Sequence, residues 1–210
     1  MIKIMLADDQ QLVREALAAL LGLEHDIEVV AQVGGGDKVI PAINRYHPDV
    51  VLLDIEMPGS ELSSGIDVAA AIRDAKLVTL TGEPVRSLIV TTFGRPGYLR
   101  RALAAGASGF MVKDTSASQL AEGIRRVHAG MHVVDPALAA ESLAYGESPL
   151  TERETEILRV AGHGATARAI GEQLFLSPGT VRNHLSSAMA KRNVSNRQEA
   201  IRIAVDNGWL

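Results

Sequence analysis

Short apolar segments of the chain each end in a polar residue that could do chemistry. These residues are Asp8 and Asp9 after residues 2–7, Asp54 after 50–53, Thr91 after 88–90 and Lys113 after 110–112. Three carboxylates at one place repel and raise each other's pKa unless a cation neutralises them. Hard oxygen ligands of this kind suit Mg²⁺, which keeps coordination positions open for a phosphate. The residue types therefore predict a Mg²⁺-assisted site that places a phosphoryl group on a carboxylate.

Buried parallel strands alternating with helices would position these groups, because short apolar segments here alternate with amphipathic ones. We expect strands near 2–7, 27–33, 50–54, 87–92 and 109–112, and helices near 12–22, 37–46, 65–74, 96–105 and 116–129. Right-handed crossovers predict an α/β fold, a doubly wound five-stranded parallel sheet of flavodoxin-like order 2-1-3-4-5. The carboxyl ends of its strands share one edge, where such sheets bind ligands.

The composition limits the class of protein. The chain has no Cys, which excludes a disulfide framework, a Cys–Zn site and a thiol nucleophile. Two aspartates by position 9 are incompatible with a secretory signal peptide, and no apolar run approaches the roughly 20 residues that cross a bilayer. We therefore expect a cytoplasmic protein without membrane insertion.

The remaining residues predict a second domain. Gly130, Pro136 and Gly146 interrupt the alternation of strands and helices. We therefore place a first, α/β domain at 1–130, a linker at 131–147 and a helical domain at 148–210. In the helical domain Thr151 and Glu154 form a capping box. Four helices are expected, starting near residues 152, 166, 178 and 196. The second and third helices are joined by about three residues, and Ser177-Pro178 open the third helix. This arrangement is typical of a helix-turn-helix.

The third of these helices has a polar face that could contact DNA. Val181, Leu185 and Met189 form its apolar stripe and leave Arg182 and Asn183 outward, where these side chains can read purine edges. Lys191 and Arg197 could neutralise phosphates. The segment from Ser177 to Gln198 contains no Asp or Glu. Residues 149–210 carry eight Lys/Arg against six Asp/Glu, whereas residues 1–148 carry 13 against 19. An acidic module joined to a nucleic-acid binder fits this asymmetry.

Both parts resemble known families. Residues 1–130 resemble the receiver domain of two-component response regulators through Asp8-Asp9, "LLDIEMPG", Thr91-Thr92 and "GASGFMVKD". Residues 148–210 resemble the LuxR-type helix-turn-helix domain through "LTERETEIL", "AIGEQLFLSPGTVRNHL" and "VSNRQEAI". The combination resembles the NarL/FixJ type of transcriptional response regulator. "DIEMPG" and "TTFGRPGYLRRAL" are most similar to the subgroup that regulates a membrane-lipid desaturase.

The resemblance implies a role for each site residue. Asp54 would accept a phosphoryl group from a sensor histidine kinase, and Mg²⁺ would be bound by Asp8, Asp9, Asp54 and the backbone carbonyl of Glu56. Lys113 would pair with a phosphoryl oxygen. Thr91 and Phe110 would form the conformational switch. Phosphorylation would promote homodimers that bind double-stranded promoter DNA. The predicted DNA-binding residues are Thr180, Arg182, Asn183, Ser186, Lys191 and Arg197.

Several positions depart from the family pattern. The segments 59–65 and 76–86 are longer than the compact loops of a receiver and could form a lid, an altered helix or a partner surface. Arg192 stands where Leu is usual. Phe110 lacks the hydroxyl of a Tyr.

Two other functions would explain part of this pattern. An aspartyl-phosphate phosphatase of the haloacid-dehalogenase type also uses Asp, Mg²⁺ and Lys, but its nucleophile lies in an Asp-x-Asp pair after the first strand, and it leaves residues 149–210 unexplained. A degenerate receiver that acts only in dimerisation would not need the full set of site residues. We therefore predict a transcription regulator rather than an enzyme.

Overall fold

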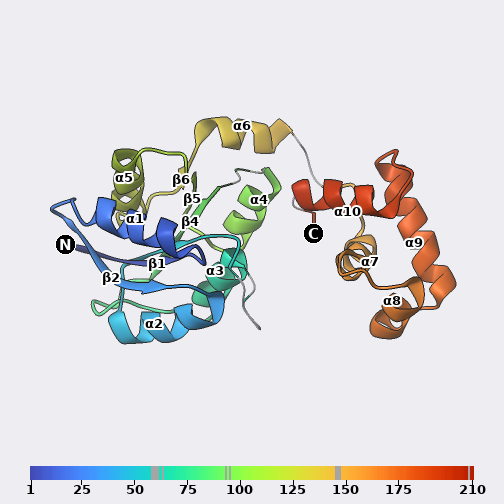
Figure 1. The fold of residues 1–210 in the computed structure, drawn as a ribbon, viewed down its shortest axis with the longest axis horizontal. Coiled ribbons are helices and arrows are strands. Elements are labelled where there is room, and N and C mark those ends of the chain that lie inside the picture. Colours follow the sequence, from blue (N-terminus) through green and yellow to red (C-terminus); the bar gives the residue numbers. More distant parts are fainter. Residues whose placement is uncertain (58–61, 63, 93, 95, 145–147, 208) are drawn as a thin grey trace. The chain divides into compact units, whose positions relative to one another are not determined.

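The computed structural model describes residues 1–57, 62, 64–92, 94, 96–144, 148–207 and 209–210. The chain separates into two compact units, one built on residues up to Ala139 and the other consisting mainly of Ala140–Leu210. The first unit alternates strands and helices, whereas the second is helical (Figure 1).

A parallel sheet forms the centre of the first unit. Its strands are β1 (Ile2–Ala7), β2 (Ile27–Val33), β3 (Val50–Leu53), β4 (Arg86–Thr91), β5 (Gly109–Val112) and β6 (Val133–Val134). They lie in the order β2-β1-β3-β4-β5-β6, and each neighbouring pair is parallel. The predicted fold class and the order of the first five strands are confirmed. The sequence interpretation missed β6, because two residues are too few to show a hydrophobic period.

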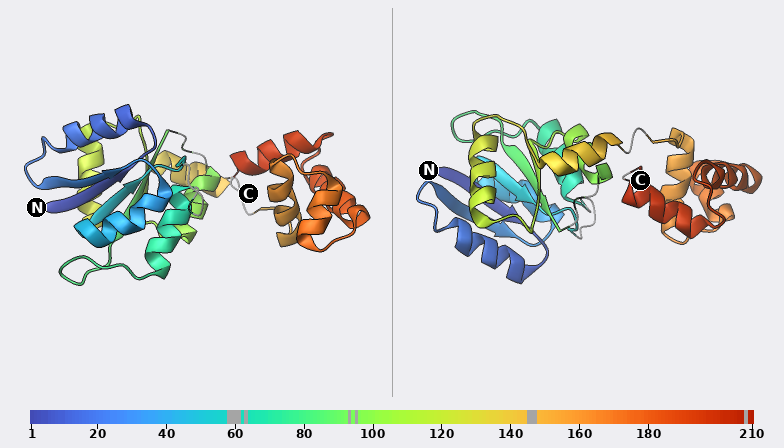
Figure 2. Two further views of the ribbon diagram at one scale, coloured as in Figure 1. Left: turned by 60° about the horizontal axis from the view of Figure 1, so that its bottom comes forward. Right: turned by 90° about the horizontal axis from the view of Figure 1, so that it is seen from above.

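Helices cover both faces of the sheet. They are α1 (Gln11–Leu21), α2 (Val39–Tyr46), α3 (Gly65–Asp74), α4 (Pro96–Ala104) and α5 (Ala117–His128), with a 3₁₀ turn η1 at Gly36–Lys38. α1 and α5 cover one face and α2, α3 and α4 the other (Figures 1 and 2). Leu21 and Ile124 pack with Leu88 and Val90 of β4 in one buried cluster. Because side chains alternate along a strand, Ser87, Ile89 and Thr91 face the opposite side.

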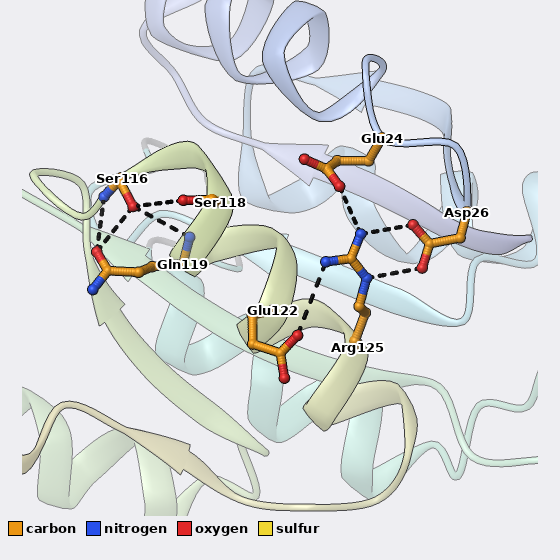
Figure 3. A network of polar contacts seen from close by, with 7 residues as sticks. All are labelled: Glu24, Asp26, Ser116, Ser118, Gln119, Glu122 and Arg125. Atoms are coloured by element: carbon orange, nitrogen blue, oxygen red, sulfur yellow. Dashed lines mark hydrogen bonds and ion pairs between the residues drawn. The ribbon is translucent and has the colours of Figure 1, made fainter.

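An arginine on α5 joins that helix to the start of β2. Arg125 bonds Asp26 at 2.7 and 2.8 Å and Glu24 at 2.6 Å, across about a hundred residues of sequence (Figure 3). These contacts lower the pKa of Asp26 to about 2, chiefly through the hydrogen bonds from Arg125. At the start of the same helix Ser116 and Gln119 form a capping box.

The long segment between α3 and β4 forms a hairpin. Thr79 N–H donates to the carbonyl of Glu83 at 2.8 Å, and Val85 N–H donates to that of Leu77 at 2.9 Å. Gly82 takes a positive φ of 83° at its tip. Part of the other long segment, 59–65, lies outside the described residues.

The second unit is held together by four helices that follow α6 (Pro136–Ala144). They are α7 (Glu152–Gly162), α8 (Ala167–Leu174), α9 (Pro178–Lys191) and α10 (Arg197–Asp206). The capping box of Thr151 and Glu154, the Ser177 cap and Pro178 in the first turn of α9 are confirmed. Ile157, Ile170 and Val181 meet in its core. In the part of the chain that the structure describes, no helix combines the length and hydrophobicity needed to cross a membrane.

Candidate phosphoacceptor and DNA-binding sites

Three carboxylates converge at the carboxyl edge of the sheet. Asp8 and Asp9 follow β1, and Asp54 follows β3, which lies beside β1. One carboxylate oxygen of each residue lies within 4.8 Å of the others. Asp8 and Asp54 are each 4 % exposed, whereas Asp9 is exposed. This cluster of hard oxygen donors, open to solvent on one side, fits a Mg²⁺ ion.

Lys113 lies against two of these carboxylates. Its Nζ is 2.7 Å from Asp8 Oδ2 and 2.9 Å from Asp54 Oδ2. Burial lowers the pKa of Lys113, but the hydrogen bonds with Asp8 and Asp54 outweigh it and raise the pKa above its usual value. Burial raises the pKa of Asp54, and the charge of Lys113 only partly opposes this. The site therefore has more negative charge than one ammonium group can neutralise.

The backbone around Asp54 is fixed by its neighbours. Asp54 N–H donates to the carbonyl of Ala7 at 2.9 Å, and Ile55 N–H donates to Asp54 Oδ1 at 2.8 Å. α3 begins directly against this residue, because a Cβ at Gly65 would collide with the carbonyl oxygen of Asp54. Only glycine fits there. The sequence interpretation did not single out Gly65, although a glycine that opens a helix was a signal of close backbone approach.

The predicted switch residues lie on neighbouring strands. Thr91 ends β4 and is 2 % exposed, and its carbonyl accepts from Lys113 N–H at 2.8 Å. Phe110 on β5 is fully buried. Glu56 is exposed and forms an isolated bridge with Ser64. The structure thus brings Thr91 and Lys113 to the same edge as the carboxylates.

Arg14 is a further neighbour that the sequence interpretation missed. It lies on α1, and its guanidinium donates to the carbonyl oxygen of Asp8. It lines a small cavity with Asp8, Leu17 and Asp54. A basic residue one turn into the first helix was the only sequence signal for this contact. Arg14 adds positive charge beside the carboxylates and holds the turn that carries Asp8.

The second candidate site is the outward face of α9. Arg182, Asn183 and Ser186 are exposed, while Thr180 is half-buried at the start of the helix. Val181, Leu185 and Ala188 are buried on the opposite face, with Met189 packed beside them. Arg182 Nε donates to the carbonyl of Pro178 at 3.1 Å, so its side chain lies along the first turn of the helix. These residues form one polar surface that a major groove could contact.

Two predicted DNA-binding residues have partners inside the helical unit. Lys191 Nζ lies 2.6 Å from Glu154 Oε2, and Ser187 Oγ donates to Glu154 Oε1 at 2.7 Å. Burial raises the pKa of the Glu154 carboxyl, but hydrogen bonds from Lys191, Ser187 and the N–H of Thr151 outweigh it and lower the pKa to about 2. Arg197 donates to the carbonyl of Ala161 at 2.6 Å. Glu154 therefore links the start of α7 to the end of α9, a contact that the sequence interpretation missed.

Arg192, the position where the family pattern has Leu, contacts the C-terminal aromatic residue. Its guanidinium lies 4.4 Å from the centre of the Trp209 ring. A cation over an aromatic ring replaces part of the apolar packing that Leu would give. Trp209 is 8 % exposed and belongs to the core of the helical unit.

Comparison with known proteins defines the class of each part. The response regulator receiver domain family matches residues 4–125. The family of bacterial regulatory proteins of the luxR type matches residues 148–204. A receiver with three clustered carboxylates and an adjacent lysine, joined to a luxR-type helix-turn-helix, is the architecture of a transcriptional response regulator.

Relatives along the whole chain agree with this class. The uncharacterized transcriptional regulatory protein YvfU of Bacillus subtilis is 41 % identical over 210 residues, and the transcriptional regulatory protein DesR of the same organism is 39 % identical, each covering all of both chains. The crystal structure of the response regulator ChrA is 32 % identical, with a TM-score of 0.57 over 100 % of this chain and 98 % of that one. The chain belongs to the NarL/FixJ family of two-component response regulators. It is a transcription regulator and not the phosphatase considered as an alternative.

Proposed function

We propose that Asp54 accepts a phosphoryl group from the phosphohistidine of a sensor kinase. The observation that carries this proposal is the ion pair of Lys113 with Asp8 and Asp54 inside the cluster of three carboxylates. A carboxylate oxygen of Asp54 attacks phosphorus in line, the P–N bond to the kinase imidazole breaks, and that nitrogen takes up a proton. Asp54 is fixed for attack by its bonds to Ala7 and Ile55.

Asp8, Asp9 and Asp54, with the backbone carbonyl of Glu56, would hold Mg²⁺. The ion supplies positive charge that balances the carboxylates and the transferred group. Lys113 is already held at the site by Asp8 and Asp54, and it exchanges one of these contacts for a phosphoryl oxygen. The Thr91 hydroxyl bonds a second phosphoryl oxygen, and Phe110 changes its position as Thr91 moves. These movements transmit the effect of phosphorylation from the edge of the sheet to the surface of the receiver.

Modification of Asp54 is testable with a small phosphodonor. Wild-type protein should be labelled by acetyl phosphate when Mg²⁺ is present and not after chelation, and Asp54→Asn should remain unlabelled. Asp74→Asn, which changes an exposed surface carboxylate at the end of α3, is the matched control and should be labelled normally. The measurement is the shift in intact mass or in Phos-tag mobility. Full labelling of Asp54→Asn would place the acceptor elsewhere.

Phosphorylation should then assemble the protein on promoter DNA. We propose domain limits of 1–130 and 148–210 for the receiver and the DNA-binding domain, with β6 (Val133–Val134) completing the receiver sheet beyond the first limit, and a homodimer as the phosphorylated state. Two recognition helices reach half-sites about one helical turn apart, and the link between them makes the second contact intramolecular. Because both its kinase and its promoter are reached inside the cell, we place the protein in the cytoplasm.

Within each copy, the outward face of α9 would contact base edges or the adjacent DNA backbone through Thr180, Arg182, Asn183 and Ser186. Lys191 and Arg197 are held by Glu154 and by the Ala161 carbonyl, so their phosphate contacts would use only the N–H groups that remain. Sedimentation of wild type with and without acetyl phosphate, and anisotropy on full and half sites, test this assembly. A phosphorylated protein that stays monomeric and binds both sites equally would contradict it.

A further inference from the structure

A cavity of about 440 Å³ lies in the receiver unit, at the edge of the sheet away from Asp54. Its walls come from α3, the hairpin of residues 77–85, the first residues of β4 and the loop between α4 and β5. Its apolar lining consists of Ala69, Ile72, Leu77, Val78, Pro84 and Val85. A mainly apolar cavity of this size with a few polar groups is typical of a site for a small molecule.

The hairpin that closes the cavity is held by its own hydrogen bonds. Besides the two bonds across the hairpin, Leu77 N–H donates to the carbonyl of Ile72 at 3.3 Å, which ties the hairpin to α3. Thr79 Oγ1 bonds Thr81 Oγ1 at 2.9 Å near the tip. Figure 2 shows this loop standing out beside α3 (left view). The wall is therefore a built element, and it belongs to the segment 76–86 in which the chain exceeds the compact receiver loop.

A serine at the start of β4 adds a hydroxyl to the lining of this cavity. Ser87 is 2 % exposed and lines the cavity. Leu88 and Val90 pack toward α1 and α5, so Ser87 points to the other side of the sheet, where the cavity lies. Its hydroxyl can donate a hydrogen bond to an acceptor on a bound molecule.

The charges around the cavity are positive. Arg73 and Lys76 line it, and none of its lining residues is Asp or Glu. The Arg73 guanidinium is already held by Asp74 at 2.8 Å and by the carbonyl of Ala104 at 2.7 Å, whereas Lys76 has no ion pair within the described ranges. Arg86 also lines the cavity, but its guanidinium extends toward Gly130. An anionic group on a bound molecule would complement Lys76.

We propose that this cavity binds a small amphiphilic anion, with an apolar body against Ala69 and Ile72 and one carboxylate or sulfonate near Ser87 and Lys76. Phosphoryl transfer at Asp54 does not use this cavity. The bound molecule would contact β4 at Ser87, and the same strand ends in Thr91 on the same face of the sheet. The site would thus give the receiver an input that is separate from its kinase.

The charge requirement can be tested with two matched fluorescent probes on the full-length protein. 1-Anilinonaphthalene-8-sulfonate carries an anion on an apolar ring system, and N-phenyl-1-naphthylamine has the same rings without it. We expect saturable binding of the sulfonate at one molecule per chain, several-fold tighter than the neutral amine. Absence of saturable binding, or equal affinity for the two probes, would overturn the proposal.

Variants locate the binding. Lys76→Glu should weaken the sulfonate by about fivefold, the effect of one exposed charge contact, and leave the neutral amine unchanged. Ser87→Val should weaken only the sulfonate, whereas Ala69→Leu should weaken both probes by filling the cavity. Lys38→Glu, on η1 and away from the cavity, is the control. If Ala69→Leu does not fold, Lys76→Glu and Ser87→Val still show whether the sulfonate binds in this cavity. Unchanged sulfonate binding in Lys76→Glu and Ser87→Val would refute the site.

Discussion

Glu154→Gln should destabilise the helical unit and remove part of the sensitivity of its stability to mild acid. The Glu154 carboxylate is almost completely buried, and its pKa is about 2 instead of the usual 4.5. A shift of this size corresponds to at most about 3 kcal/mol of stability at neutral pH. Lys191 is about one-third exposed, so solvent screening reduces the expected loss to about 1–2 kcal/mol.

The dependence on pH has a definite sign. Because folding lowers the pKa of Glu154, its contribution is fully present above the unfolded value of 4.5 and is lost as the pH falls toward 2. The difference in unfolding free energy between wild type and Glu154→Gln should therefore fall by roughly half between pH 7 and about pH 3.3.

Urea unfolding followed by tryptophan fluorescence measures this difference. Trp209 is the single tryptophan of the chain and lies in the core of the helical unit, so it reports on that unit in the full-length protein. Glu156→Gln, on the exposed face of the same helix, is the matched control and should change the stability little. The reasoning is refuted if Glu154→Gln is as stable as wild type at pH 7, or if its deficit is the same at both pH values.

Three other outcomes are expected. Gly65→Ala should slow acetyl phosphate labelling by at least about tenfold, because the new Cβ displaces the phosphoacceptor backbone and small misplacements of reacting groups are costly; labelling at the wild-type rate would count against the close approach. Arg125→Gln should lower the thermal midpoint of the receiver unit in calorimetry. The difference from wild type should be lost as the pH falls from 3.8 to about 2, where Asp26 becomes protonated. A difference in midpoint that does not depend on pH would contradict the ion pair. Arg182→Ala should reduce discrimination between cognate and random DNA by about 1–3 kcal/mol in fluorescence anisotropy; an equal loss on both DNAs would show that Arg182 contacts phosphate.

The cluster of site residues at the carboxyl edge of the receiver sheet could be predicted from the sequence, because it depends on patterns within short segments. The strands that end in a site residue each contain an uninterrupted apolar run of at least three residues, and parallel strands place their ends at one edge of the sheet. Asp8, Asp54 and Lys113 therefore come together in the structure as expected. The helix starts at Ser116 and Thr151 were predictable for the same reason, since a capping box lies within four residues.

What could not be predicted depends on residues that are distant in sequence. The partner of Lys191 is 37 residues away at Glu154, and neither residue type by itself indicates a buried pair. The same applies to Arg125 and Asp26, which are 99 residues apart. The hairpin of residues 77–85 was visible only as extra length, because its turn depends on Gly82 and on backbone bonds that carry no hydrophobic period.

The position of β6 affects how the receiver can be studied alone. Val133 and Val134 pair with Gly109 and Phe110 and so cover the outer side of β5. A fragment that stops at residue 130 lacks this strand and leaves a bare edge, which is a template for pairing with a second copy. Such a fragment would self-associate through β5 whether or not Asp54 is modified. Fragments that end after residue 139 retain the strand and avoid this false dimer.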